Sequence, residues 1–132
     1  MAADYSANND SSTAFGDEPH VLLAGLLANF DAASAREIME LYSKSTALLL
    51  ARLKSAISQE TIPVEEVRAI AHELKGASSM ASLTQMESLS KRLSEEIKQS
   101  NWQAVRDVSD KLHAALGALD AAYQSWINSQ KL

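Results

Sequence analysis

Apolar residues recur at intervals of three and four through most of this chain, and this spacing is the strongest constraint on its fold. Residues three or four positions apart lie on one face of an α-helix. We therefore expect a long amphipathic helix from about residue 34 to residue 58. Its buried face is predicted to consist of Ile38, Leu41, Tyr42, Leu48, Leu49, Leu53, Ala56 and Ile57.

Similar patterns predict helices on both sides of this one. The short segment Val21–Asn29 is apolar on most sides, so we expect it to lie across one end of a bundle. Another helix is expected from about Pro63 to Ala81. Proline suits the first helical position, and the acidic side chains of Glu65 and Glu66 suit the positive end of the helix dipole.

Two serines mark the expected starts of the last two helices. The segments "SLTQ" at 82–85 and "SNWQ" at 100–103 have the form of a capping box, so we expect Ser82 and Ser100 to be N-caps. Apolar residues keep helical spacing after each serine. They are Leu83, Met86, Leu89, Leu93 and Ile97, and then Trp102, Val105, Val108, Leu112, Leu116, Leu119, Tyr123, Trp126 and Ile127.

The composition favours an all-helical domain over a sheet protein. The 132 residues are 46% apolar but only 5% aromatic, with four glycines and two prolines. The short connections predict an all-α, up-and-down antiparallel four-helix bundle with an additional short N-terminal helix. Residues 1–17 show no periodicity and are expected to be a flexible tail or linker, which leaves residues 18–132 as one domain.

Charge and residue content argue against several functional classes. The formal net charge is −5, so a nucleic acid or an anionic membrane is a poor partner. The chain has no cysteine, and its longest apolar runs are far too short to span a bilayer. We expect a cytoplasmic protein without direct membrane contact, or the cytoplasmic end of a membrane-bound sensor. A monomer is expected, because the apolar faces are accounted for within the bundle.

His72 is the candidate for chemistry. With about 100° between successive residues, His72 falls opposite the core-facing arc of its helix, and Arg68, Lys75, Gly76 and Ser79 fall beside it. The core-facing arc consists of Val67, Ile70, Ala71, Leu74, Ala77, Ser78 and Ala81.

Gly76 is unusual in this position, because glycine inside a helix costs about 1 kcal/mol relative to alanine. It would leave open space beside the histidine ring, while Lys75 places a positive charge there. A neutral imidazole is a nucleophile at neutral pH, and a cation would offset the charge of an attached phosphoryl group. An ordinary surface histidine, with Gly76 explained by a kink or close packing, remains an alternative.

The stretch "AHELKGASSMASLTQMESLSKRL" resembles the histidine-containing phosphotransfer (HPt) domain of phosphorelays. That family carries H-x-L-K-G followed by small residues and leucines at helical spacing. The resemblance extends over about residues 19–128, including "IMELYSKSTALLLARLKSAI", where Tyr42 stands where an aromatic often lies near the active histidine. Ser82 departs from the pattern, because the family commonly has glycine there. The residues that match the motif are His72, Leu74, Lys75, Gly76, Ala77, Ser78 and Ser79.

The resemblance implies that His72 accepts a phosphoryl group from the aspartate of one receiver domain and passes it to another. Lys75 would stabilise the group and Gly76 would admit the receiver. The domain itself would bind no cofactor and no metal, since the receiver supplies Mg²⁺. It would be a carrier rather than an enzyme, and the chain has no glycine-rich loop of an ATP-binding kinase.

Partners implied by the resemblance are the receiver domains of response regulators or of a hybrid sensor kinase. Two other functional classes remain open: a helical module that works by non-covalent binding, and a structural or dimerising bundle. His20 and His113 lack partners at metal-ligand spacing, so we expect a surface or capping residue and a helix-face residue. The residues expected to contact a partner are Arg68, Ala69, Glu73, Ser79, Met80 and Tyr42.

Overall fold

The structure is a computed structural model that describes residues 19–130. Within this range the chain forms no strand. Its helices are α2 (Pro19–Asn29), α3 (Ala32–Ile57), α4 (Val64–Met80), α5 (Thr84–Lys98) and α6 (Trp102–Gln130). The predicted fold class and order of helices are confirmed. The tail predicted for residues 1–17 and the side chain of His20 lie outside the described residues.

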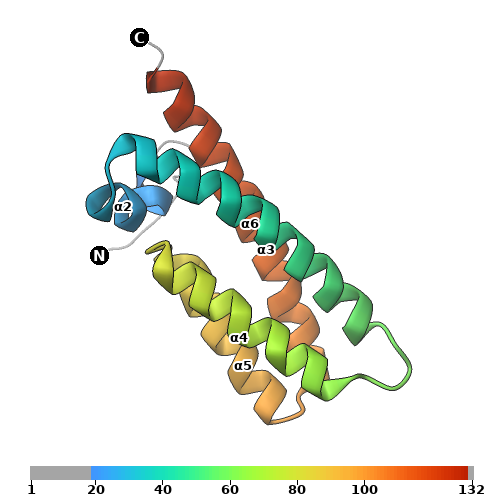
Figure 1. Cartoon of the computed structure of the whole chain (residues 1–132). Coiled ribbons are helices and arrows are strands. Elements are labelled where there is room, and N and C mark those ends of the chain that lie inside the picture. Colours follow the sequence, from blue (N-terminus) through green and yellow to red (C-terminus); the bar gives the residue numbers. More distant parts are fainter. Residues whose placement is uncertain (1–18, 131–132) are drawn as a thin grey trace, which may run out of the picture.

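Two long helices and one shorter hairpin make up the bundle. Figure 1 shows α3 and α6 extending past the end of the hairpin formed by α4 and α5. Each helix from α3 to α6 packs against the next, and α6 closes the ring against α3. The remaining helix, α2, lies at the end where the hairpin turns and packs mainly on α6. This is the expected four-helix bundle with an additional N-terminal helix.

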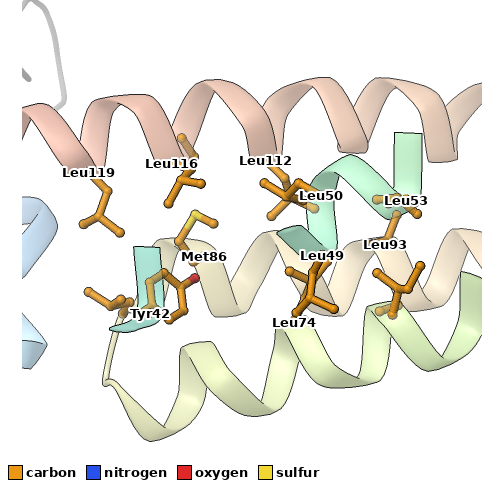
Figure 2. Close-up of a cluster of buried hydrophobic side chains, with 14 of the residues drawn as sticks. Tyr42, Leu49, Leu50, Leu53, Leu74, Met86, Leu93, Leu112, Leu116 and Leu119 are labelled. Carbon is orange, nitrogen blue, oxygen red and sulfur yellow. The ribbon is translucent and has the colours of Figure 1, made fainter. Parts of the chain in front are cut away.

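Large aliphatic side chains from all four bundle helices fill the centre of the molecule (Figure 2). Each buried leucine stabilises the fold by roughly 1.5–3 kcal/mol relative to an exposed one. The core fixes the rotation of each helix, and so decides which side chains α4 presents to solvent. Fully buried examples are Leu50, Leu53, Leu74, Met86, Leu93 and Leu112.

The predicted buried face of α3 is partly wrong. Leu41 is 70% exposed and Leu48 is 65% exposed. Both lie on one outer stripe, about 130° from the middle of the buried side, because α3 turns Met39 and Leu50 inward instead. The spacing of leucines alone did not reveal that this helix carries apolar residues beyond its core-facing arc.

Ser82 and Ser100 are not N-caps, which corrects both predictions. Each serine ends the preceding helix in the left-handed conformation, with φ of 58° and 55°. After α4, the N–H of Ser82 donates to the Ser79 carbonyl and the N–H of Leu83 to the Ser78 carbonyl, the Schellman pattern. The turn after α5 repeats it. The N-cap position of α5 is Leu83, and at α6 the side chain of Asn101 accepts from the N–H of Ala104 at 3.5 Å.

Gly25 allows α2 to approach the α4–α5 turn at the backbone level. A Cβ built on Gly25 would lie 2.1 Å from the carbonyl oxygen of Ser82, which is not a possible contact. Beside it, Asn29 Nδ2 donates to Ser82 Oγ at 3.0 Å. The α2 helix is therefore held directly against the turn that follows α4.

Candidate functional site

His72 lies on the outer surface of α4, as its position on the helix predicted. The buried side of this helix consists of Val67, Ile70, Ala71, Leu74 and Ser78, whereas His72 is exposed. Two glutamates in the first turn suit the dipole of the helix, which begins directly after Pro63. The packing of α4 thus leaves the imidazole ring accessible to a second protein.

Gly76 lies one turn after His72 and is not required by the fold. Apart from its two chain neighbours and the backbone of α4, no atom of residues 19–130 lies within 4 Å of the place that a Cβ would occupy. Its φ is not in the left-handed region, and α4 continues to Met80. Close packing and a helix break are therefore excluded as reasons for this glycine. Open space beside the ring is the remaining structural consequence.

A hollow of about 160 Å³ adjoins His72 between α4 and α5. We call it the α4–α5 hollow, and its floor is apolar while its rim carries basic groups. Arg68 and Lys98 come from different helices and line the same hollow as His72. The hollow is lined by Arg68, Ala71, His72, Ser94, Ile97 and Lys98.

Ser94 and Lys98 were not predicted from the sequence as part of the site. Both belong to α5, and they line the same hollow as His72 because the chain reverses between α4 and α5. Residues at similar distances before and after such a turn lie opposite each other. Counting outward from Ser82 would have placed residues 92–94 beside His72, once the turn itself was located correctly.

The cations around His72 differ in their partners. Arg68 forms an ion pair with Glu65 at 2.6 Å on the exposed surface of α4. Such exposed pairs contribute between zero and about 1 kcal/mol, so a stronger anion can replace the carboxylate. Lys75 is exposed on the same helix. The surface can therefore offer positive charge to an anionic group at the ring.

The residues expected to contact a partner fall into two groups. Ala69, Glu73, Ser79 and Met80 are exposed with Arg68 on the outer surface of α4, and Met80 is 82% exposed. Tyr42 is different, because it is buried in the core with 4% of its surface exposed. Figure 2 shows its ring among the core side chains.

The hydroxyl of Tyr42 joins α3 to α4. It lies 2.9 Å from Ser78 Oγ, and Ser78 Oγ in turn donates to the Leu74 carbonyl at 2.7 Å. Since the serine proton is used in that bond, Tyr42 is the donor to Ser78. Burial raises the pKa of Tyr42. The Tyr42 hydroxyl thus supports α4 from within the core.

An apolar groove of about 310 Å³ lies between α3 and the end of α4, and sequence analysis did not predict it. The exposed side chains of Leu41 and Met80 stand on it, and Leu48 continues the apolar surface along α3. The apolar groove is lined by Phe30, Ile38, Leu41, Tyr42, Ser45, Ala77, Met80 and Ala81.

A match to a known protein family identifies the domain that contains His72. The sequence profile of the Hpt domain matches residues 37–122, which include all of α4 and α5. The chain belongs to the HPt family. HPt domains are phosphoryl carriers of phosphorelays rather than kinase domains, and they act with receiver domains of two-component systems.

A solved structure has the same fold as this HPt domain. The crystal structure of a histidine-containing phosphotransfer protein from maize superposes with a TM-score of 0.74. The match covers 88% of this chain and 98% of the maize chain, at 14% sequence identity. A comparison with curated proteins gives no match. At this identity the maize structure establishes the architecture, and the individual roles of residues rest on geometry.

Residues 19–130 contain neither a metal centre nor a membrane-spanning helix. Among residues 19–130, no group of three or more His, Asp or Glu side chains could hold a metal ion. In the same range, every helix is too short or too polar to cross a bilayer. His113 lies on the exposed side of α6, with Nδ1 2.9 Å from the Ser109 carbonyl.

Proposed function

We propose that His72 is the phosphoryl carrier of this HPt domain. The observation that carries the proposal is the exposed imidazole beside the empty space over Gly76. In the family motif, His72 and Gly76 occupy the matching positions. A receiver's active site could therefore reach the ring without displacing any side chain of α4.

The transfer proposed is a displacement at phosphorus. The imidazole Nε2 attacks the aspartyl phosphate of a receiver, a P–N bond forms, and the P–O bond to the aspartate breaks, which releases its carboxylate. The reverse step delivers the group to the aspartate of a second receiver. The Mg²⁺ for both steps is proposed to belong to the receivers.

Basic side chains are proposed to hold the phosphoryl group once it is attached. Lys75 follows the ring on α4, and Arg68 and Lys98 line the α4–α5 hollow next to it. Charge-assisted contacts with phosphate oxygens are stronger than neutral hydrogen bonds. Ser94, at the same hollow, offers a hydroxyl to the ring or to the phosphate.

The receiver is proposed to dock over α4 and the apolar groove. Met80 and Leu41 expose large apolar surfaces that a monomer would otherwise leave in water. The groove and His72 share the outer surface of α4, so one partner can cover both. We propose that the chain acts as a monomer, since a second copy on the groove would block this approach.

A transfer assay with a matched control tests the proposal. Purified receiver domains carrying radiolabelled phosphate are mixed with the wild type, with His72→Gln and with His113→Gln. His113 is a suitable control because it is also exposed and also followed four residues later by an open glycine, Gly117. The wild type and His113→Gln should take up label that acid removes, as phosphohistidine requires, and His72→Gln should take up none.

Two results would contradict the carrier function. Equal labelling of His72→Gln would show that another residue is the acceptor. Tight receiver binding with no label in any variant would favour the alternative of a non-covalent interaction module, for which the apolar groove provides a surface.

A further inference from the structure

Asn29 and Ser82 connect the two chain segments that form one end of the apolar groove. Asn29 Nδ2 donates to Ser82 Oγ at 3.0 Å and to the Gly25 carbonyl at 2.9 Å. Phe30, directly after Asn29, lines the groove, and so do Met80 and Ala81 just before Ser82. The hydrogen bond therefore ties the groove residue that follows α2 to those at the end of α4.

The hydroxyl of Ser82 is not needed to end α4. A residue in the left-handed conformation closes the helix through backbone bonds alone, and glycine does so with less strain than serine. What serine adds at this position is the oxygen that accepts from Asn29. The departure from the family's glycine thus coincides with a contact to α2, a helix outside the residues 37–122 that match the family profile.

We propose that the Asn29–Ser82 hydrogen bond is a positioning contact that sets the width of the apolar groove and thereby the affinity for a receiver domain. The inference rests on the proposed function. Asn29 and Ser82 are proposed to act by positioning Phe30 and Met80, which line the groove. They are not proposed to contact the phosphoryl group. Loss of the bond should let α2 move away from the turn, so that the groove fits its partner less well.

The test is Ser82→Gly, which removes the hydroxyl and keeps a backbone that glycine adopts readily. In single-turnover transfer from a labelled receiver, the receiver concentration that gives half the maximal rate (KM) should rise about three- to tenfold, as expected for one hydrogen bond. The maximal transfer rate should stay at the wild-type value. Labelling by phosphoramidate, a small donor that needs no docking surface, should not change. Asn29→Ala should raise KM similarly, and the double variant should be no worse than either single variant.

Ser100→Gly is the matched control. Ser100 has the same left-handed conformation at the end of α5, but it is exposed and lies at the opposite end of the hairpin. Its substitution should leave KM unchanged. A wild-type KM for Ser82→Gly, or an equal rise for Ser100→Gly, would overturn the positioning role while leaving the carrier function intact. Absence of labelling in the wild type would instead refute the proposed function, and this inference with it.

Discussion

Gly76 can indicate function because the usual structural explanations for a glycine inside a helix do not apply to it. A glycine inside a helix is commonly explained by a left-handed φ or by a close neighbour. Gly25 has such a neighbour in the Ser82 carbonyl, but Gly76 has neither feature within the described residues. Gly76 therefore destabilises α4 relative to alanine, and no packing contact or backbone requirement at this position offsets that loss. Under the proposed function, the open space at Gly76 gives a receiver access to His72.

Gly76→Leu separates stability from access. We expect the substitution to stabilise α4 by about 0.5–1 kcal/mol, because leucine is a better helix former than glycine. Transfer from a receiver should fall on the order of 100-fold, since a side chain over the ring displaces the reacting groups. Thermal unfolding and the labelling assay measure the two effects.

Gly117→Leu serves as the comparison for that experiment. No atom of the described chain, other than the backbone of α6, lies within 4 Å of a Cβ at Gly117, so its fold should tolerate leucine equally. Transfer should stay at the wild-type rate in this variant. Normal transfer by Gly76→Leu as well would show that the space over Gly76 has no role.

The sequence was sufficient to predict that His72 and Gly76 face outward from their helix. It was not sufficient to predict which residues of other helices lie near them. Helical periodicity within α4 places both residues outward, because it concerns one helix alone. Lys98 and Ser94 could not be placed in this way, since their proximity depends on where the hairpin turns. Tyr42, predicted to contact a partner, is buried in the core with its hydroxyl on Ser78, and it also lines the apolar groove.

The connections between elements were the part least accessible from sequence. The pattern S-x-x-Q fits a serine that starts a helix, but Ser82 and Ser100 each end one. The α4–α5 connection comprises residues 81–83, so Ser82, which closes α4, directly precedes Leu83, the N-cap position of α5. A local pattern cannot assign a residue to one side of such a turn, whereas the existence of the helices follows from their long apolar stripes.

Gly25→Ala tests the contact between α2 and this turn. The added methyl group would overlap the Ser82 carbonyl, so α2 must shift or the turn must open. We expect a loss of about 1–3 kcal/mol in the free energy of unfolding, the usual cost of overpacking. Urea denaturation of Gly25→Ala and of Gly117→Ala provides the measurement. The second variant should gain stability, and an unchanged midpoint for the first would argue against the close approach.

The packing of α6 against α3 completes the ring of four bundle helices, and Tyr123 contributes a hydrogen bond to this packing. Its hydroxyl donates to Glu40 at 2.8 Å, joining residues 83 positions apart. Burial, and then the hydrogen bond to the Glu40 carboxylate, raise the pKa of Tyr123 from 10.0 to about 12. Neutral tyrosine is thus favoured in the folded state.

This shift predicts a loss of stability in alkali. Because the pKa is higher in the folded protein, the contribution is complete below pH 10.0 and disappears as the pH rises through about 12. The difference between wild type and Tyr123→Phe in unfolding free energy should shrink by roughly 2 kcal/mol over this interval. Urea denaturation at successive pH values measures it, and parallel curves for the two proteins would contradict the assignment.

The α4 helix divides its residues almost completely between two surfaces. Val67, Ile70, Ala71, Leu74 and Ser78 are held by the bundle, whereas Ala69, Glu73, Ser79 and Met80 are exposed. Substitutions in the second set leave the packed interior untouched. Such a division would let natural variation or protein engineering redirect the domain to a different receiver while the folded scaffold and the proposed carrier, His72, stay the same.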